Sequence, residues 1–453
     1  MDYNKNGIME IERLYEIYCG CNGLTTDSRD CPEGSMFFAL KGESFDGNKF
    51  AEMAIEKGCA YAVIDNPEYA KNDRFIVVDD CLKTLKLLAR HHRRQFNIPV
   101  IGITGTNGKT TTKELTAAVL SEKYNVLYTQ GNFNNDIGVP KTLLRLNKDH
   151  EIAIIEMGAS HPGDIKTLAE TAEPDYGIIT NVGRAHLQGF GSFEGVVQTK
   201  GELFDYLRTK PASTIFLHNE NEHLATISQG LNIVRYGTDN SSSLSVCGKV
   251  TACNPLLEIE LTYPTNMKES NNSSTCQLAN PSTQIPTHLI GTYNLTNMLA
   301  AACIGKHFGV SEEQICHALS NYIPSNNRSQ LTITESNRLI VDAYNANPTS
   351  MMAALRNFND MQVDHKMVIL GDMKELGEIS AEEHQRCVDY LKDCSFDTVW
   401  LVGDEFGKTD CTFRKFNNVD EVKAAINEDK PKNYYILVKG SNSIKLYLLP
   451  EYL

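Results

Sequence analysis

The feature that constrains this chain most is a buried strand, a glycine-containing turn and a helix that follow one another between residues 98 and 120. The apolar run Val100–Ile103 is typical of a central parallel strand. Beyond the turn, Leu115, Val119 and Leu120 recur at helical spacing and give the helix one apolar face. A turn between such a strand and such a helix forms a cradle for a phosphate group.

The turn itself carries the residues that a phosphate site needs. Gly105 and Gly108 allow backbone N–H groups to point inward, and Lys109 adds a positive charge at the helix N-terminus. Thr110 stands where the hydroxyl of a P-loop binds Mg²⁺. The spacing departs from the standard P-loop, because Ile103 occupies the position of its first glycine. A chance glycine-rich turn is the alternative, but the order of elements favours a nucleoside triphosphate site.

Composition limits the kinds of protein that this chain can be. Its 453 residues predict roughly three domains at about 150 residues each. A net charge of −14 argues against a nucleic acid as the main partner. The N-terminus lacks the apolar core of a signal peptide, and no run approaches the ~20 apolar residues of a membrane span. The 13 cysteines show no paired spacing, so we expect free thiols and a cytoplasmic location.

Alternating strands and helices divide the chain into three blocks, 1–97, 98–323 and 324–453. The alternation predicts an α/β fold with doubly wound parallel sheets. Residues 239–286 differ, because they are rich in Asn, Ser, Thr and Pro and predict an antiparallel excursion with a loop near 268–284. Ser380–Glu383 reads as a capping box that opens a helix. The expected strands are 37–40, 60–64, 75–78, 100–103, 152–156, 176–180, 214–217, 339–342, 367–370, 399–402 and 435–438.

Polar residues follow several of these strands, where open α/β sheets collect their ligands. Glu156 ends one strand and could be a solvated side chain, but its place near the phosphate loop favours a metal ligand. His186 follows the next strand, and Asp342 ends a later one. Asn347 precedes Pro348 and predicts a helix cap. Three further residues are weaker candidates: Ser28 and Arg29 lie in a turn that could meet a phosphate, and Lys200 reads as an ordinary surface lysine.

Taken together, these motifs resemble the Mur ligase family of ATP-dependent, amide-forming enzymes of peptidoglycan precursor synthesis. The resemblance extends over nearly the whole chain, in the family's order. It rests on Thr104–Thr110, Asn134–Pro140, Glu156–Gly158, Thr180–His186, Arg328, Asp342–Pro348, Leu370–Gly377 and Lys439–Ser441.

Within the family, the runs at 134–140, 342–348 and 370–377 resemble the member that joins D-alanyl-D-alanine to UDP-N-acetylmuramoyl-tripeptide. The first block, with Thr26–Arg29 and Gly34–Gly42, is similar to its UDP-binding domain. The Asp-Asn-Pro-Arg signature of the ligase that adds the diamino acid is absent from the sequence. The resemblance implies a central ATP-binding domain and a C-terminal Rossmann-like domain for the incoming dipeptide. Nothing in the sequence requires more than a monomer.

The resemblance also implies roles for individual residues. Lys109 contacts the β- and γ-phosphates, while Thr110 and Glu156 hold one Mg²⁺. His186 and a carbamylated Lys200 support a second Mg²⁺, so Lys109, Lys200 and His186 are the catalytic set. The remaining ATP contacts are Gly105, Thr106, Asn107, Gly108, Thr111, Asn294, Asn297, Arg328 and Asp342. The substrate contacts are Ser28, Arg29, Asn134, Asn135, Tyr344, Asn345 and Asn347.

Two positions depart from the family pattern. Tyr293 stands where relatives commonly have His, and Asn442 stands where they often have Arg. Another ligase on the same scaffold, such as a folylpolyglutamate synthase-like enzyme, remains an alternative. So does a regulatory ATP-binding protein without ligase chemistry. A GTPase-type switch is disfavoured, because no Asn-Lys-x-Asp signature is present.

Overall fold

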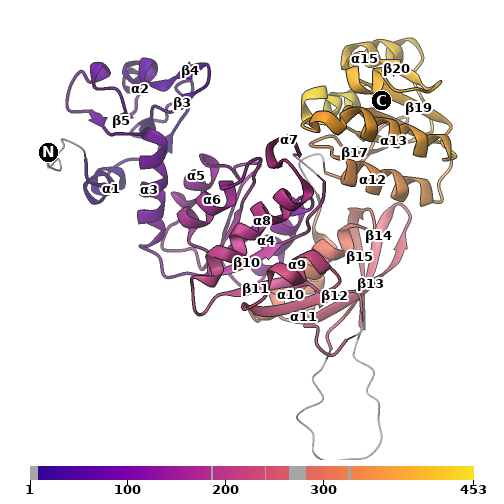
Figure 1. Cartoon of the computed structure of the whole chain (residues 1–453), viewed down its shortest axis with the longest axis horizontal. Helices are drawn as coiled ribbons and strands as arrows, with labels where there is room; N and C mark the ends of the chain where they lie inside the picture. Colours follow the sequence, from indigo (N-terminus) through magenta and orange to yellow (C-terminus); the bar gives the residue numbers. More distant parts are fainter. Residues whose placement is uncertain (1–8, 185–186, 240, 265–281, 325–327) are drawn as a thin grey trace, which may run out of the picture.

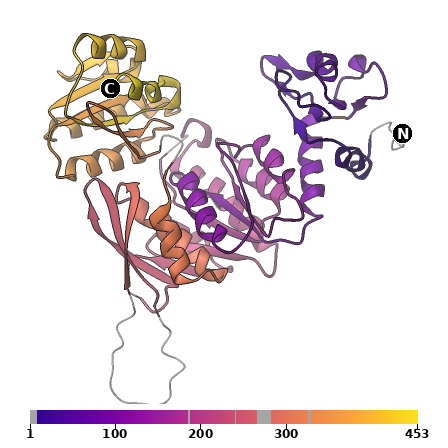
Figure 2. The same cartoon turned by 180° about the vertical axis from the view of Figure 1, so that it is seen from behind.

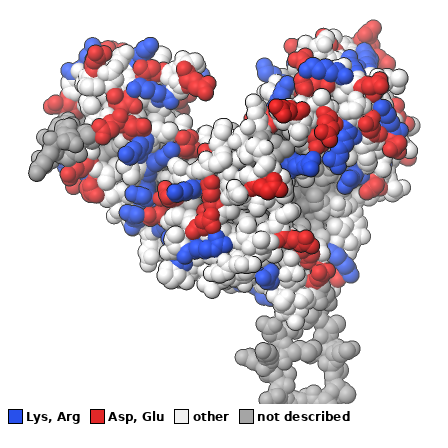
Figure 3. All heavy atoms as spheres, viewed as in Figure 1, with Lys and Arg blue, Asp and Glu red and all other residues white. Residues whose placement is uncertain are grey.

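The computed structural model describes residues 9–184, 187–239, 241–264, 282–324 and 328–453. It contains three α/β units in chain order, and the first and third units stand on the same side of the central one (Figure 1). The space-filling view shows a hollow between these two outer units, with acidic and basic side chains intermingled on both (Figure 3). No helix among the described residues is long and apolar enough to cross a membrane.

The first unit is a four-stranded parallel sheet in the order β1-β2-β5-β6, with a short β3–β4 hairpin beside it. Its last helix, α3 (Cys81–Arg93), begins where the Asp80 carboxylate accepts a hydrogen bond of 2.7 Å from the Lys83 backbone N–H. The other elements are α1 (Ile11–Cys19), β1 (Leu24–Thr25), β2 (Met36–Phe38), β3 (Lys41–Gly42), β4 (Phe45–Asp46), α2 (Ala51–Glu56), β5 (Tyr61–Ile64) and β6 (Phe75–Val77).

The central unit is built on a nine-stranded sheet in the order β15-β14-β13-β12-β11-β10-β7-β9-β8. All pairings among strands β7–β13 are parallel. Strand β14 pairs antiparallel with β13 and with β15, so the sheet has an antiparallel edge. The strands are β7 (Val100–Thr104), β8 (Val126–Tyr128), β9 (Ile152–Glu156), β10 (Tyr176–Ile179), β11 (Thr214–His218), β12 (Asn232–Gly237), β13 (Val246–Cys253), β14 (Leu256–Thr262) and β15 (Ser282–Ile290).

Helices cover both faces of this sheet because its strands carry apolar side chains on both sides. In β7, Val100 packs into one core while Ile101 and Ile103 pack into the other. The second of these cores holds α4 and α10, which pack against each other behind the sheet (Figure 2). The helices are α4 (Lys109–Ser121), α5 (Gly138–Leu143), α6 (Asp164–Ala172), α7 (Leu187–Phe190), α8 (Phe193–Arg208), α9 (Glu222–Ile227), α10 (Asn294–His307) and α11 (Glu312–Asn321).

The third unit has a six-stranded sheet in the order β16-β17-β21-β18-β19-β20, in which β16 alone runs antiparallel to its neighbour. Its elements are β16 (Gln330–Ile333), β17 (Arg338–Asp342), α12 (Pro348–Asp360), β18 (Lys366–Gly371), α13 (Ser380–Lys392), β19 (Thr398–Val402), α14 (Asp404–Gly407), β20 (Arg414–Phe416), α15 (Val419–Glu428) and β21 (Tyr435–Lys439).

The predicted fold class is confirmed, with two local corrections. Helix α13 does begin at Ser380, but the capping box is wrong, because the Ser380 hydroxyl donates a hydrogen bond of 2.6 Å to Glu405 instead of capping the helix. The antiparallel excursion is present as β13, β14 and β15. Its expected loop is wrong for 282–284, which belong to β15, and the stretch 265–281 lies outside the described residues.

The first unit joins the central one through α1 and α3. The Tyr18 hydroxyl donates a hydrogen bond of 2.9 Å to the Leu144 carbonyl oxygen, and His92 Nε2 lies 2.9 Å from the Leu146 carbonyl oxygen. Arg93 pairs with Asp175 at 3.0 Å. These buried and half-buried contacts fix α3 against the central unit.

Candidate active site

A cavity of about 960 Å³ lies where the three units meet. Its walls come from the phosphate loop, from the segments after β8, β9 and β17, and from the start of α10. The residues that line it include Lys86, Thr106, Asn107, Gly108, Lys109, Thr111, Asn134, Asn135, Asp136, Glu156, Ser160, His161, Asp164, Asn181, Tyr293, Asn294, Asn297, Arg328, Ser329, Asp342, Tyr344, Asn345, Asn347, Thr349, Ser350, Glu375 and Lys439.

The phosphate loop has no room for side chains at its two glycines. Gly108 has a φ of +76°, and a Cβ there would lie 2.5 Å from Asn297 Oδ1. Gly105 has a φ of +145°, and its Cβ would lie 2.1 Å from the Thr180 hydroxyl oxygen. The loop is also held by Asn181, whose side-chain oxygen accepts a hydrogen bond of 2.9 Å from the Asn107 backbone N–H. The cradle is therefore preformed by the neighbouring strand and helix.

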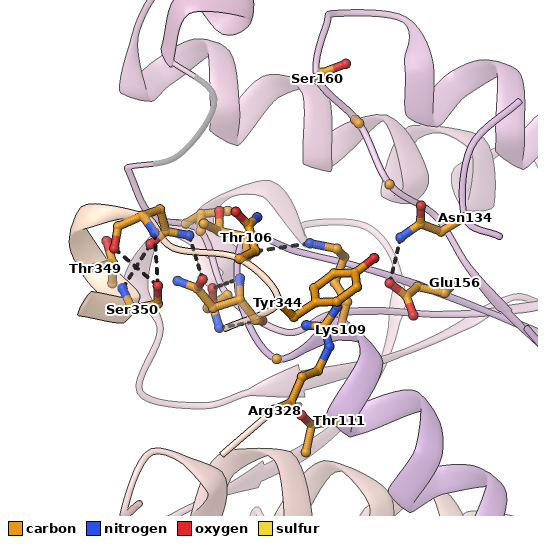
Figure 4. Close-up of a pocket in the computed structure, with 18 of the residues that line it drawn as sticks. Thr106, Lys109, Thr111, Asn134, Glu156, Ser160, Arg328, Tyr344, Thr349 and Ser350 are labelled. Carbon is orange, nitrogen blue, oxygen red and sulfur yellow. Dashed lines mark hydrogen bonds between the residues drawn. The ribbon is translucent and has the colours of Figure 1, made fainter. Parts of the chain in front are cut away.

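Lys109 lies at the mouth of this loop (Figure 4). Its ammonium group donates hydrogen bonds to the carbonyl oxygens of Gly105 at 2.7 Å and Thr106 at 3.0 Å. Burial, assisted by the nearby charge of Arg328 and opposed by Glu156, lowers the pKa of Lys109 to about 8. An anion bound in the cradle would replace these carbonyl contacts and favour the charged form of the lysine.

Glu156 ends β9 and is buried beside the start of α4. One carboxylate oxygen, Oε1, accepts a hydrogen bond of 2.8 Å from the Asn134 amide (Figure 4). The same oxygen accepts one of 3.1 Å from the Thr110 hydroxyl. The other, Oε2, has no hydrogen-bond partner among the described residues. A buried carboxylate oxygen without a donor, next to a hydroxyl, has the chemistry of a Mg²⁺ site. The described residues contain no cluster of three His, Cys, Asp or Glu that could hold a metal without help from a ligand.

Lys113 is a functional candidate that the sequence analysis missed. It lies one turn along α4 from Lys109, and its side chain is fully buried. Its ammonium group lies 3.9 Å from Glu156 Oε2 and 3.5 Å from Glu114 Oε1. Burial lowers the pKa of Lys113, while Glu156 and Glu114 oppose the shift. At these distances the Lys113 ammonium group is close enough to offset part of the negative charge of both carboxylates.

Lys200, which its local sequence predicts to be a surface lysine, is instead buried in α8. Its ammonium group lies 5.3 Å from the centre of the Phe190 ring. Burial, assisted by the nearby charge of Lys109 and opposed by Asp164 and Glu202, lowers the pKa of Lys200 to about 7. Among the described residues, Lys200 is not one that lines the cavity. His186 lies outside the described residues.

The start of α10 brings Asn294 and Asn297 to the cavity wall. The Thr112 hydroxyl donates a hydrogen bond of 3.1 Å to Asn297 Oδ1, and Asn297 Nδ2 donates one of 2.9 Å to Asn294 Oδ1. Tyr293, the departure from the family pattern, hydrogen-bonds Ser329 through its hydroxyl at 2.6 Å. Tyr293 therefore ties α10 to the segment that leads into the third unit.

The third unit contributes the opposite wall. The Asp342 carboxylate and the buried Lys439 ammonium group form an ion pair of 2.5 Å. The Arg328 guanidinium lies 4.0 Å from the centre of the Tyr344 ring, and both face the phosphate loop (Figure 4). Asn347 caps α12 and also donates a hydrogen bond of 2.8 Å to Asn107 Oδ1, which links the third unit directly to the phosphate loop.

Some predicted residues lie apart from the cavity walls. Thr110 is buried behind the loop, and Gly105 supplies its backbone only. Ser28 is buried in the first unit, where its carbonyl oxygen accepts a hydrogen bond from Lys57. The Arg29 guanidinium is largely exposed and pairs with Asp27 at 2.7 Å. Asn442, the second departure, is not among the described lining residues either.

Three family models match consecutive parts of the chain. The model described as the Mur ligase family, catalytic domain matches residues 21–93. The Mur ligase middle domain matches residues 103–305, and the Mur ligase, glutamate ligase domain matches residues 327–442.

Individual proteins resemble the chain over almost its full length. A UDP-N-acetylmuramoyl-tripeptide–D-alanyl-D-alanine ligase from Bacillus subtilis is 33% identical, with 94% of this chain and 91% of that protein covered. The structure of UDP-N-acetylmuramoylalanyl-D-glutamyl-2,6-diaminopimelate–D-alanyl-D-alanyl ligase from Acinetobacter baumannii superimposes with a TM-score of 0.80 at 27% identity, covering 97% of both chains. The MurF ligase of Thermotoga maritima in complex with ADP gives a TM-score of 0.82 at 25% identity, covering 95% of this chain and 96% of that one. The phosphate cradle, the three units and these matches agree: the chain belongs to the Mur ligase family.

Proposed function

We propose that this protein is an ATP-dependent ligase that joins D-alanyl-D-alanine to UDP-N-acetylmuramoyl-tripeptide. The observation that carries the proposal is the likeness over 94% of the chain to a ligase of that name. The cavity supports it, because a phosphate cradle, a buried carboxylate and a wall from the third unit surround one space. An amide ligase that uses ATP must bring a nucleotide, an acid and an amine into such a space.

The proposed reaction has two steps. A carboxylate oxygen of the tripeptide attacks the γ-phosphorus of ATP, the bond to the bridging oxygen breaks, and an acyl phosphate and ADP form. The amine nitrogen of D-alanyl-D-alanine then attacks the acyl carbon, loses a proton, and inorganic phosphate leaves from a tetrahedral intermediate. The loop N–H groups and Lys109 bind and orient the phosphates in both steps, so the protein acts mainly by positioning and charge neutralisation.

Mg²⁺ is part of the proposal. Thr110 and Glu156 would hold one ion, which the hydrogen-bond-free Oε2 of Glu156 supports. When bound, the ion neutralises negative charge on the phosphates. Lys200 and His186 would support a second ion, once Lys200 Nζ has added to CO₂ and lost a proton to give a carbamate. The burial of Lys200 supports this role, because a largely uncharged amine is the form that reacts with CO₂.

We assign the UDP portion to residues 1–97, ATP to residues 98–323 and the dipeptide to residues 324–453. The hydrogen bond between Asn347 and Asn107 supports a closed arrangement in which the third unit excludes water from the acyl phosphate. Within the same proposal the enzyme acts as a monomer in the cytoplasm. Asn134, Asn135, Tyr344 and Asn345 would contact the peptide substrates from the cavity wall.

Phosphate release from ATP and Mg²⁺ tests the proposal. The assay contains UDP-N-acetylmuramoyl-tripeptide, with or without D-alanyl-D-alanine, and the product is identified by its mass. We expect release that requires both substrates, and a pentapeptide product. Release that requires a different amine would contradict the assignment of the dipeptide and keep the ligase chemistry. No release with any pair of substrates, despite ATP binding, would contradict the proposed activity.

A further inference from the structure

Lys86 is the one residue that the first unit contributes to the cavity wall, within the part of the chain that the structure describes. It lies on α3, which runs from the first unit to the side of α5 and α6 in the central unit (Figure 1). Its side chain keeps 22% of its surface exposed, so its ammonium group can reach a molecule in the cavity. Neither the family motifs nor the sequence analysis singled out this residue.

The partner of Lys86 leaves its ammonium group largely available. Asp136 Oδ2 lies 3.5 Å away, and its side chain is 44% exposed. A charge-assisted hydrogen bond is shorter, at about 2.7–2.9 Å. No described residue accepts a hydrogen bond from the Lys86 ammonium group, although this group has three N–H donors. The pair therefore holds the side chain at the cavity wall without saturating it.

Other charged groups of the cavity, at Asp164 and at Lys439, are already engaged. The Asp164 carboxylate accepts hydrogen bonds from the backbone N–H groups of Ser160 at 2.9 Å and His161 at 2.8 Å. At the opposite wall, Lys439 is paired with Asp342. Lys86 is thus a cation with unused donors at the end of the cavity that faces the first unit.

The substrate of the proposed function must cross this end of the cavity. Its UDP portion belongs to the first unit and its reacting carboxylate to the phosphate loop, so the peptide lies between them. The tripeptide in the name of the Acinetobacter baumannii ligase contains a D-glutamyl residue and 2,6-diaminopimelate. Each of these residues carries one carboxylate that takes part in neither a peptide bond nor the ligation.

Resting on the proposed function, we propose that Lys86 binds a non-reacting carboxylate of the tripeptide and so selects and positions the acid substrate. The two sources of that carboxylate are the D-glutamyl residue and the far end of the diamino acid. A charged hydrogen bond of this kind contributes about 1.5–3 kcal/mol, which corresponds to a factor of roughly 10 to 100 in affinity.

The first experiment compares Lys86→Met with Lys83→Met, an exposed lysine on the same helix that is not among the described lining residues. Methionine keeps the apolar stem and removes the charge. We expect Lys86→Met to raise the KM for UDP-N-acetylmuramoyl-tripeptide by about 10- to 100-fold and to leave the KM for ATP unchanged. Lys83→Met should match the wild type. Circular dichroism and the thermal midpoint check that both variants fold.

The second experiment changes the substrate. One tripeptide has the free D-glutamyl carboxylate converted to an amide, a second has lysine in place of diaminopimelate, and a third has both changes. With the wild-type enzyme, the tripeptide that lacks the bound carboxylate should have the same raised KM that Lys86→Met has for the natural tripeptide. The KM for this changed tripeptide should not rise further in Lys86→Met. This identifies the source of the carboxylate.

The outcomes separate the two proposals. If Lys86→Met raises the KM relative to the wild type by the same factor for the doubly changed tripeptide as for the natural one, Lys86 has a structural role and the inference fails. If Lys86→Met has the same KM as the wild type for every tripeptide, the inference is overturned while the ligase function stands. A wild-type enzyme that forms no product with the natural tripeptide or with any of the three changed ones overturns both.

Discussion

Substituting Gly108 by alanine tests whether the phosphate cradle is as tightly built as the structure indicates. An alanine at a φ of +76° costs about 1–2 kcal/mol, because its Cβ crowds the backbone in the left-handed region. The same Cβ would lie 2.5 Å from Asn297 Oδ1, which must therefore move. Moving it breaks the hydrogen bonds that Asn297 forms with Thr112 and Asn294, at about 1 kcal/mol each. The total loss of unfolding free energy is about 3–4 kcal/mol.

Gly131→Ala is the matched control. Gly131 also has a positive φ, +52°, but a Cβ there would meet nothing within 4 Å. It should therefore lose only the backbone part, about 1–2 kcal/mol. The difference between the two variants, about 2 kcal/mol, is the contribution of the contact with Asn297.

Urea unfolding of both variants measures this difference, and calorimetric titration with a non-hydrolysable ATP analogue and Mg²⁺ measures binding. Because Asn297 also lines the cavity, we expect Gly108→Ala to weaken nucleotide binding at least about tenfold and Gly131→Ala to leave it unchanged. Equal stabilities and equal affinities in the two variants would refute the reasoning, since the crowding at Gly108 would then have no energetic effect.

Three further predictions concern other parts of the molecule. Lys200→Ala should abolish ligation, and short carboxylic acids such as acetate should restore part of the phosphate release; full activity without them would contradict the carbamate. Asn347→Ser should keep the cap of α12 but lose the amide bonded to Asn107, so it should raise the KM for ATP several-fold at nearly wild-type stability. Asn347→Ala should also lose the cap, and with it about 1 kcal/mol of unfolding free energy. Equal stabilities of the two variants in urea unfolding would contradict this. Burial lowers the pKa of His92 below its ordinary 6.5, so the unfolded chain binds the proton more readily and the unfolding free energy should fall as the pH drops below that value. His92→Gln should flatten this dependence in urea titrations between about pH 5 and 7.5, and an unchanged slope would contradict the assignment.

The sequence predicted the elements whose cause is local. The strand before Gly105 and the strand that ends at Glu156 are continuous apolar runs, and Asn347 before Pro348 is a helix cap, so each was recognisable from neighbouring residues. The short strands β8 and β20 were not predicted, because three residues carry too little periodicity and only their pairing partners define them.

The candidate site was predicted less completely, because burial is a property of the whole fold. Lys200 follows a polar stretch and reads as exposed, yet α8 turns it into the core. Lys113 and Lys86 are single lysines in helices, and nothing near them in the sequence distinguishes them from solvated ones. They become recognisable only when the sheet brings Glu156 behind α4 and α3 reaches the cavity.

The hydrogen bond between Thr112 and Asn297 joins residues 185 positions apart, and it has a consequence for synthesis on the ribosome. Helix α4, which begins at the phosphate loop, packs against the earlier strands β7, β8 and β9 on one side and against α10 on another, so the second side has no cover until α10 has left the exit tunnel. During that interval the nascent chain exposes the sheet face that α10 will bury, which is the kind of surface that chaperones bind. We therefore expect the phosphate cradle to be complete only after about two thirds of the chain, through the end of α10 at His307, has been made, and a fragment that ends before α10 to lack the contact with Asn297.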